Sequence, residues 1–323
     1  MANGSRKAKK YEWMSKKVHL RWDSVGLSSG TYADSLYIDV AQCLSIINRK
    51  LVRQGHVFRL KNFHIYSEEA DSDDFRVKIA TLPHNWVTRN AWVKGKAMWD
   101  KMNAQAMETG MMNLIPKWHD YKIYFNLAHY SQGNTETSTL GGNAGLPRDA
   151  DGTIVPTGEW IYSTYHDSGG GGTSDEYNVH MLGPHSGSTG SWLSVGLIEA
   201  YSQSRNRVEN GPTQLPIVEN SPWFKLFGDD DQTNDTVNSL QDDNDSAPYD
   251  MDDYCGSVAD GGEVVVTTRL QEGNIPIVGP MIPRSFTAPC GLVRVEIDAA
   301  QNEGTIGTVF IGFEAEVLVP MDA

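Results

Sequence analysis

Short segments in which apolar and polar residues alternate recur along the whole chain, and they constrain its fold more than any other feature. Alternation is typical of strands, because successive side chains of a strand point to opposite faces. About ten such segments are separated by polar or glycine-rich turns. They cover residues 17–22, 36–40, 57–67, 75–82, 121–128, 160–165, 192–201, 263–270, 291–297 and 305–319. We expect 75–82 to form a hairpin with 57–67 across the acidic turn between them.

Two segments have a helical period instead. In residues 41–53 the apolar side chains Leu44, Ile47 and Leu51 recur at spacings of three and four, and Gly55 supplies a stop. Residues 85–108 form the other candidate, although a glycine weakens its middle. These patterns predict an all-β fold, a single jelly roll (β-sandwich) with two short helices and long surface loops.

The loops lengthen toward the end of the chain. One is expected at about 131–190, which contains GGNAG, GGGG and a hairpin turn at Asp151-Gly152. The other spans 228–256 and includes an acidic run at 229–254 with scarcely an apolar residue. Since no interdomain linker is visible, we expect a disordered basic arm over residues 1–17 and one jelly-roll domain over 18–323.

Charge divides the chain into two unlike parts. Residues 1–101 carry 18 Lys and Arg against 10 Asp and Glu, a net charge of +8, whereas the remainder carries −22. The positive charge is densest in the arm, which interleaves it with Tyr11 and Trp13. Lysine binds phosphate without reading sequence, and aromatic rings stack on unpaired bases. The body is acidic, so any contact with a polyanion must be local.

Several classes of protein are disfavoured. The three cysteines are too few and too widely spaced for a disulfide framework or a zinc knuckle. No run of about 18 apolar residues predicts a membrane span, and the N-terminus lacks the apolar region of a secretory signal. We therefore expect a protein made inside a cell, with no membrane span.

No enzyme is expected, because the motifs of phosphate-binding loops, zinc proteases and serine hydrolases are absent. A β-sandwich hydrolase that uses strand carboxylates remains an alternative. The carboxylates on expected strands are Glu199, Glu296, Glu314 and Glu316.

No cofactor is expected either, and the one ion considered is structural calcium. The acidic run offers hard oxygen ligands, but it lacks the glycine and terminal glutamate of an EF-hand loop. The weak candidates for metal binding are Asp229, Asp230, Asp231, Asp243 and Asp245.

Three segments together resemble capsid proteins of small circular, Rep-encoding single-stranded DNA viruses, of the unclassified kind found in marine and invertebrate samples. They are KVHLRWDSVGLSSG, SLYIDVAQCLSIINRKLVRQGHVFRLKNFHIY and LPHNWVTRNAWVKGKAMWDKMN, within about the first 130 residues.

The resemblance implies a jelly-roll subunit that self-assembles into an icosahedral shell around a circular single-stranded DNA genome. The basic arm would lie inside the virion against the DNA, and the long loops would lie outside, where a host receptor such as a glycan could bind. The residues implied in nucleic-acid binding are Arg6, Lys7, Lys9, Lys10, Lys16 and Lys17 in the arm, with Arg49, Lys50, Arg53 and Arg59 on an inner basic surface. The alternative is a carbohydrate-binding jelly-roll attachment protein, in which the arm has no role.

Overall fold

The structure is a computed structural model, and most of its described part is β-sheet with few helices, which confirms the all-β expectation. It describes residues 14–22, 26–27, 34–67, 75–107, 118–132, 145–149, 151, 153–156, 158–167, 175–188, 191–205, 256, 263–271, 285–299, 304–305 and 308–322. Of the expected arm, residues 1–13 lie outside these ranges, as does the acidic run at 229–254.

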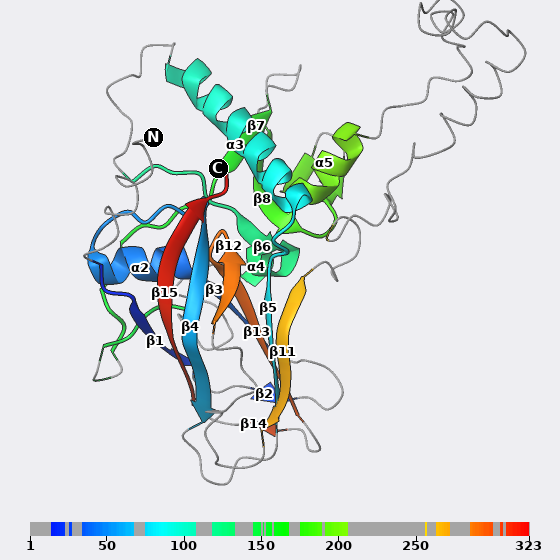
Figure 1. The fold of residues 1–323 in the computed structure, drawn as a ribbon. Coiled ribbons are helices and arrows are strands. Elements are labelled where there is room, and N and C mark those ends of the chain that lie inside the picture. Colours follow the sequence, from blue (N-terminus) through cyan, green and yellow to red (C-terminus); the bar gives the residue numbers. More distant parts are fainter. Residues whose placement is uncertain are drawn as a thin grey trace, which may run out of the picture.

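Eight strands form two four-stranded antiparallel sheets (Figure 1). Sheet A has the order β1-β15-β4-β12, and sheet C has the order β11-β5-β13-β3. The bounds are β1 Lys17–Trp22, β3 Asp34–Asp39, β4 His56–Ser67, β5 Phe75–Thr81, β11 Val264–Gln271, β12 Ser285–Pro289, β13 Leu292–Ala299 and β15 Val309–Pro320. Two short strands, β2 Gly26–Leu27 and β14 Gly304–Thr305, pair with each other outside these sheets.

The two sheets share one apolar core, so they pack as a sandwich. In β1 the alternation buries Val18, Leu20 and Trp22 and leaves Lys17 and His19 exposed. Most buried residues of sheet A belong to the same cluster as most of those of sheet C, such as Val293 and Val295 in β13.

The expected hairpin between residues 57–67 and 75–82 is wrong. β4 pairs with β15 and β12 in sheet A, whereas β5 pairs with β13 and β11 in sheet C. The chain therefore crosses from one sheet to the other between these strands. Alternation predicted both strands correctly, but it carries no information about distant partners.

A large segment, residues 82–263, is inserted between β5 and β11 and carries a third sheet, sheet D. In Figure 1 its helices α3 and α5 lie beyond the upper end of the sandwich. Sheet D has the order β6-β8-β10-β9, with β7 paired to β8. The bounds are α3 Trp86–Ala106, β6 Tyr124–Asn126, α4 Leu127–Gln132, β7 Thr164–Asp167, β8 Asp175–Leu182, β9 Ser186–Ser188, β10 Ser191–Gly196 and α5 Leu197–Arg205.

The insertion corrects two expectations. The long loop expected at about 131–190 contains β7, β8 and β9. The described part of the chain has four helices rather than two short ones, because α4 and α5 join α2 (Val40–Asn48) and the 21-residue α3. The turn expected near Asp151 is present in its described residues, where an antiparallel bridge joins Arg148 to Ile154.

Two expected strands turn into helices partway. The segment 192–201 leaves sheet D at Gly196 and continues as α5, in which Leu197, Ile198 and Tyr201 are buried at a helical spacing. The segment 121–128 is a strand only over β6, because the side chain of Asn126 accepts a hydrogen bond from the backbone N–H of His129 and begins α4.

The glycine that weakens α3 has a packing reason. A Cβ at Gly95 would lie 2.5 Å from the hydroxyl oxygen of Tyr121 and 2.9 Å from Leu197. The absence of a side chain lets α3 lie close to the insertion core, and the hydroxyl of Tyr165 donates to the Gly95 carbonyl at 2.7 Å. The local propensity cost of this glycine is of order 1 kcal/mol, and tertiary packing outweighs it.

A buried carboxylate joins the sandwich to the insertion. Asp39 begins α2 by accepting from the backbone N–H of Gln42, and its other oxygen accepts from Gln54, Trp160 and Tyr162. Burial raises the pKa of Asp39 to about 6, although all four donors act in the opposite direction. α2 ends earlier than expected, because Arg49 adopts a left-handed backbone conformation with φ of 48°.

Candidate nucleic-acid interface

The chain enters the sandwich beside a cluster of cations. Lys16 and Lys17 stand at the start of β1, with side chains 45% and 73% exposed. Their ammonium nitrogens lie 4.0 Å from carboxylate oxygens of Glu316 and Glu314 on β15. At that distance and exposure an ion pair contributes little, so both lysines can turn toward another anion.

The end of α2 is fixed against this entry point. The backbone N–H of Ser15 donates to the side chain of Asn48, whose amide group donates back to the Ser15 carbonyl. The next residues, Arg49 and Lys50, close α2 with backbone bonds to Ile46 and Ser45 and keep their side chains exposed. The Ser15–Asn48 contact thus holds Lys16 close to the end of α2, where Arg49 and Lys50 lie.

Strand β4 extends the same positive surface. Arg59 and Lys61 alternate with the buried Phe58 and Leu60, so they project from the outer side of sheet A. Lys61 donates to Glu316 at 2.6 Å, and this hydrogen bond, assisted by the charges of Lys61, Lys16 and Arg59, holds the pKa of Glu316 below its usual value.

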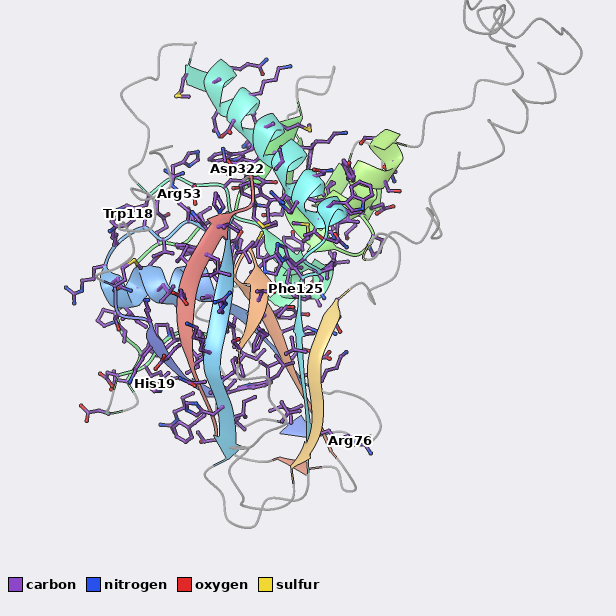
Figure 2. All side chains as sticks on the ribbon, viewed as in Figure 1. His19, Arg53, Arg76, Trp118, Phe125 and Asp322 are labelled. Carbon is purple, nitrogen blue, oxygen red and sulfur yellow. The ribbon has the colours of Figure 1, made fainter. Side chains whose placement is uncertain are left out.

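We call this surface the basic face. It consists of Lys16, Lys17, Arg21, Arg59 and Lys61, with the two acids Glu314 and Glu316. Five cations against two carboxylates give a local excess of positive charge on a chain whose net charge is −14. His19, labelled in Figure 2, projects on this side of β1.

Arg53 does not join the basic face. Its guanidinium lies 2.9 Å from Asp120 of the insertion, whose side chain is 5% exposed. Burial raises the pKa of Asp120, while the charges of Arg53 and Lys122 lower it. Arg53 therefore compensates a buried acid at the junction between sandwich and insertion. The remaining candidates, Arg6, Lys7, Lys9 and Lys10, lie outside the described residues.

The carboxylates considered for hydrolysis do not form an acid–base pair. Glu199 lies in α5 rather than on a strand, and it accepts from the backbone of His185 and from Gln203. Glu314 and Glu316 project side by side among lysines. A pair of carboxylates in contrasting environments, which glycoside hydrolysis needs, is not formed by these residues.

The outer side of sheet C carries a charge network that sequence reasoning missed. Lys78 lies 2.7 Å from Glu263 and 2.9 Å from Glu296, and Arg294 lies at the same two distances from the same two acids. Burial acts to lower the pKa of Lys78, but the two carboxylates outweigh it and raise the pKa. Alternation places Lys78 and Glu296 on outward positions, whereas their contact depends on the pairing of β5 with β13.

Metal binding gains no support from the described residues, where no three His, Cys, Asp or Glu side chains are grouped as a metal ion would need. The calcium candidates Asp229, Asp230, Asp231, Asp243 and Asp245 lie outside those residues. Cys43 and Cys290 are buried free thiols. Among the helices that the structure describes, none is long and apolar enough to cross a membrane.

Comparison with known proteins gives no relative. No family model matches the chain, and neither the curated proteins nor the solved structures contain a match. Function must therefore be argued from topology and charge.

Proposed function

We propose that this chain is a viral capsid protein, a jelly-roll subunit that self-assembles into an icosahedral shell around single-stranded DNA. The observation that carries the proposal is the strand order of the two sheets. When the eight sandwich strands are numbered along the chain, sheet A reads 1-8-3-6 and sheet C reads 2-7-4-5.

This order is what a wound ribbon produces. The pairs 1-8, 2-7, 3-6 and 4-5 are each neighbours, and successive pairs alternate between the two sheets. A long antiparallel ribbon wrapped around a core in this way gives two Greek keys, the arrangement of jelly rolls, which recur in viral capsid and lectin domains. The topology therefore supports the jelly-roll assignment and reduces the candidate functions to a small set.

Charge selects among these functions. The first 21 residues carry seven cations and one acid. Three of these cations, Lys16, Lys17 and Arg21, belong to the basic face. If the net charge of +6 of these 21 residues engages single-stranded DNA, the log-log salt slope of binding is about −4. One arm binds weakly, but many arms held on one shell bind through a high effective concentration. In this proposal the basic face lines the interior, and the protein is structural rather than enzymatic.

The test is removal of the arm. Deleting residues 2–13 keeps the Ser15–Asn48 contact, so the sandwich should fold and closed particles should still form in negative-stain electron microscopy. Their 260/280 nm absorbance ratio should fall toward that of protein alone, because only the cations of the basic face remain. A full-length control in which Arg6, Lys7, Lys9 and Lys10 become Gln should behave in the same way, since charge rather than length is responsible.

The second candidate is a glycan-binding module. Trp86 and Trp118 are 43% and 48% exposed, and exposed aromatic rings are typical of sugar-binding surfaces. That function predicts a monomer or small oligomer. It also predicts that deleting residues 2–13 does not affect the function, because the arm has no role in it. A soluble monomer across salt, pH and calcium conditions would therefore replace the capsid proposal with this one.

A further inference from the structure

Helix α3 buries one side and exposes apolar residues on the opposite side. Ala91, Trp92, Gly95 and Trp99 are buried, and they share the side that packs on the insertion. At about 100° per residue, the positions on the opposite side of the helix are 86, 93, 97 and 104. In Figure 1, α3 lies beyond the upper end of the sandwich, with α5 beside it.

We call these four positions the α3 stripe, and they hold Trp86, Val93, Ala97 and Ala104. Trp86 and Val93 are 43% and 38% exposed, and both alanines are exposed as well. The ring of Trp86 meets the ring of Tyr201 on α5 edge-on, with centroids 6.3 Å apart, which holds it in place. Single exposed apolar residues are common on protein surfaces, but four on one side of a helix form a strip suited to a contact with protein.

The spacing of the α3 stripe is symmetric about position 95. Trp86 and Ala104 each lie nine residues from that position, and Val93 and Ala97 each lie two residues from it. If α3 of a second copy lies antiparallel across this point, Trp86 meets Ala104 of that copy and Val93 meets Ala97. A large side chain then faces a small one at each of the four places, so the two helices can pack closely.

The charges beside the stripe fit the same arrangement. Arg89 and Asp100 lie on one flank of α3, six and five residues from position 95 in opposite directions. Antiparallel pairing therefore places Arg89 of each copy beside Asp100 of the other. The side chain of Asp100 is 50% exposed beside Lys96 of its own helix and can accept a second donor. Lys94, on the other flank, is directed toward α5, where it donates to Ser204 at 2.9 Å.

We propose that α3 pairs with α3 of a second copy across a two-fold axis at position 95. This inference rests on the proposed function and deepens it, because it names one contact between the subunits of the shell. The contact is small, roughly 800 Å² or less in total, so an isolated pair binds weakly. In a shell, other contacts hold each copy and give the pair a high effective concentration.

The test uses two charge variants of the full-length protein, alone and mixed. Ala97→Glu and Val93→Lys each bury an unpaired charge in the pair. Each should raise the protein concentration at which half of the chains are associated by about tenfold or more, measured by sedimentation. In an equal mixture the new carboxylate of one variant faces the new amine of the other, so association should return toward the wild-type value.

The matched control is Gln105→Glu. Residue 105 is exposed on α3 but lies about 100° around the helix from the stripe, so this variant should associate like the wild type. Thermal unfolding of each variant shows whether the fold is preserved.

The inference is overturned if either single variant associates like the wild type, or if the mixture does not recover the association that both have lost. Its failure is distinguishable from failure of the capsid proposal. Closed particles that both variants form as readily as the wild type would remove only the α3 contact. Dimers that depend on the stripe but never close into particles would keep this contact and remove the capsid function.

Discussion

The outer sides of sheets A and C use the same kinds of charged residue in opposite ways. On the basic face of sheet A, Lys16 and Lys17 are about half or more exposed and stand 4.0 Å from their acids. On sheet C, the side chains of Lys78, Arg294, Glu263 and Glu296 are between 5% and 19% exposed, with separations of 2.7 to 2.9 Å. The first surface has surplus positive charge, and the second is balanced at two cations and two acids.

This difference separates binding from stability. Exposed pairs gain little from each other because water screens them, so their charges stay available to a partner. Desolvated pairs depend on each other, because removing one member leaves an uncompensated charge in a poorly solvated place. We therefore expect substitutions on sheet A to change the binding of polyanions, and substitutions on sheet C to change folding.

The largest expected effect is on sheet C. Glu296→Gln leaves Lys78 and Arg294 to share one carboxylate, and the free energy of unfolding should fall by about 3 kcal/mol. Glu314→Gln, the matched change on sheet A, should alter it by no more than about 0.5 kcal/mol. Urea denaturation of both variants gives the two values, and equal losses would mean that the two surfaces do not differ as described.

The next effect concerns the lysines. The raised pKa of Lys78 means that its contribution to stability is complete below the unfolded value of 10.5 and is lost as pH rises through the higher folded value. Only the neutral amine is acylated, so Lys78 should react much more slowly with an acylating reagent at pH 9 than the exposed Lys17 does. Mass spectrometry of the labelled peptides measures both rates. Labelling of Lys78 as fast as Lys17 would contradict the network.

A smaller effect is expected for single cations of the basic face. Lys17→Gln should reduce the salt slope of single-stranded DNA binding by about 0.7 and weaken binding about fivefold at 0.1 M salt, without a change in stability. Lys101→Gln, an exposed lysine on α3, is the control and should leave the slope unchanged. If both variants lower the slope alike, DNA binding is not localised to sheet A.

The smallest effect is the titration of Glu316. Its pKa is lowered chiefly by the hydrogen bond from Lys61, so its contribution to stability is present above the unfolded value of 4.5 and is lost as pH falls through the folded value. Lys61→Met should move the midpoint, followed by NMR of the carboxyl carbon, back toward 4.5. High salt should shift it in the same direction, because the site is exposed.

Local sequence patterns predicted strands better than their partners. The boundaries of β1 and β4 agree closely with the alternation, since each strand has one buried and one outward side. The pairing of β4 with β15 was not predictable, because it joins residues about 250 positions apart. In sheet D, β6, β7 and β10 overlap the expected strands at 121–128, 160–165 and 192–201. β8 and β9 were missed, because they lie in the glycine-rich stretch expected to be a loop and β8 pairs in parallel with β6 and β10.

The same limit applies to the site. The positive charge of the N-terminal segment follows from composition, whereas Arg49 and Lys50 were proposed for a basic surface only by the resemblance to capsid proteins. Arg53 was assigned to the same surface because nothing in the sequence shows that Asp120 packs against it. The packing of His64 over Gly312 was not predictable for a similar reason, since the two residues meet only once β4 and β15 are placed side by side.

Cryo-electron microscopy of the purified full-length protein tests the central claim most directly. The capsid account predicts closed icosahedral particles in which the outer side of sheet A lines the interior and contacts nucleic-acid density, with the insertion placed away from that density. A particle with sheet A on its exterior surface would contradict the assignment of the basic face. The absence of closed particles under all assembly conditions would contradict the capsid function itself.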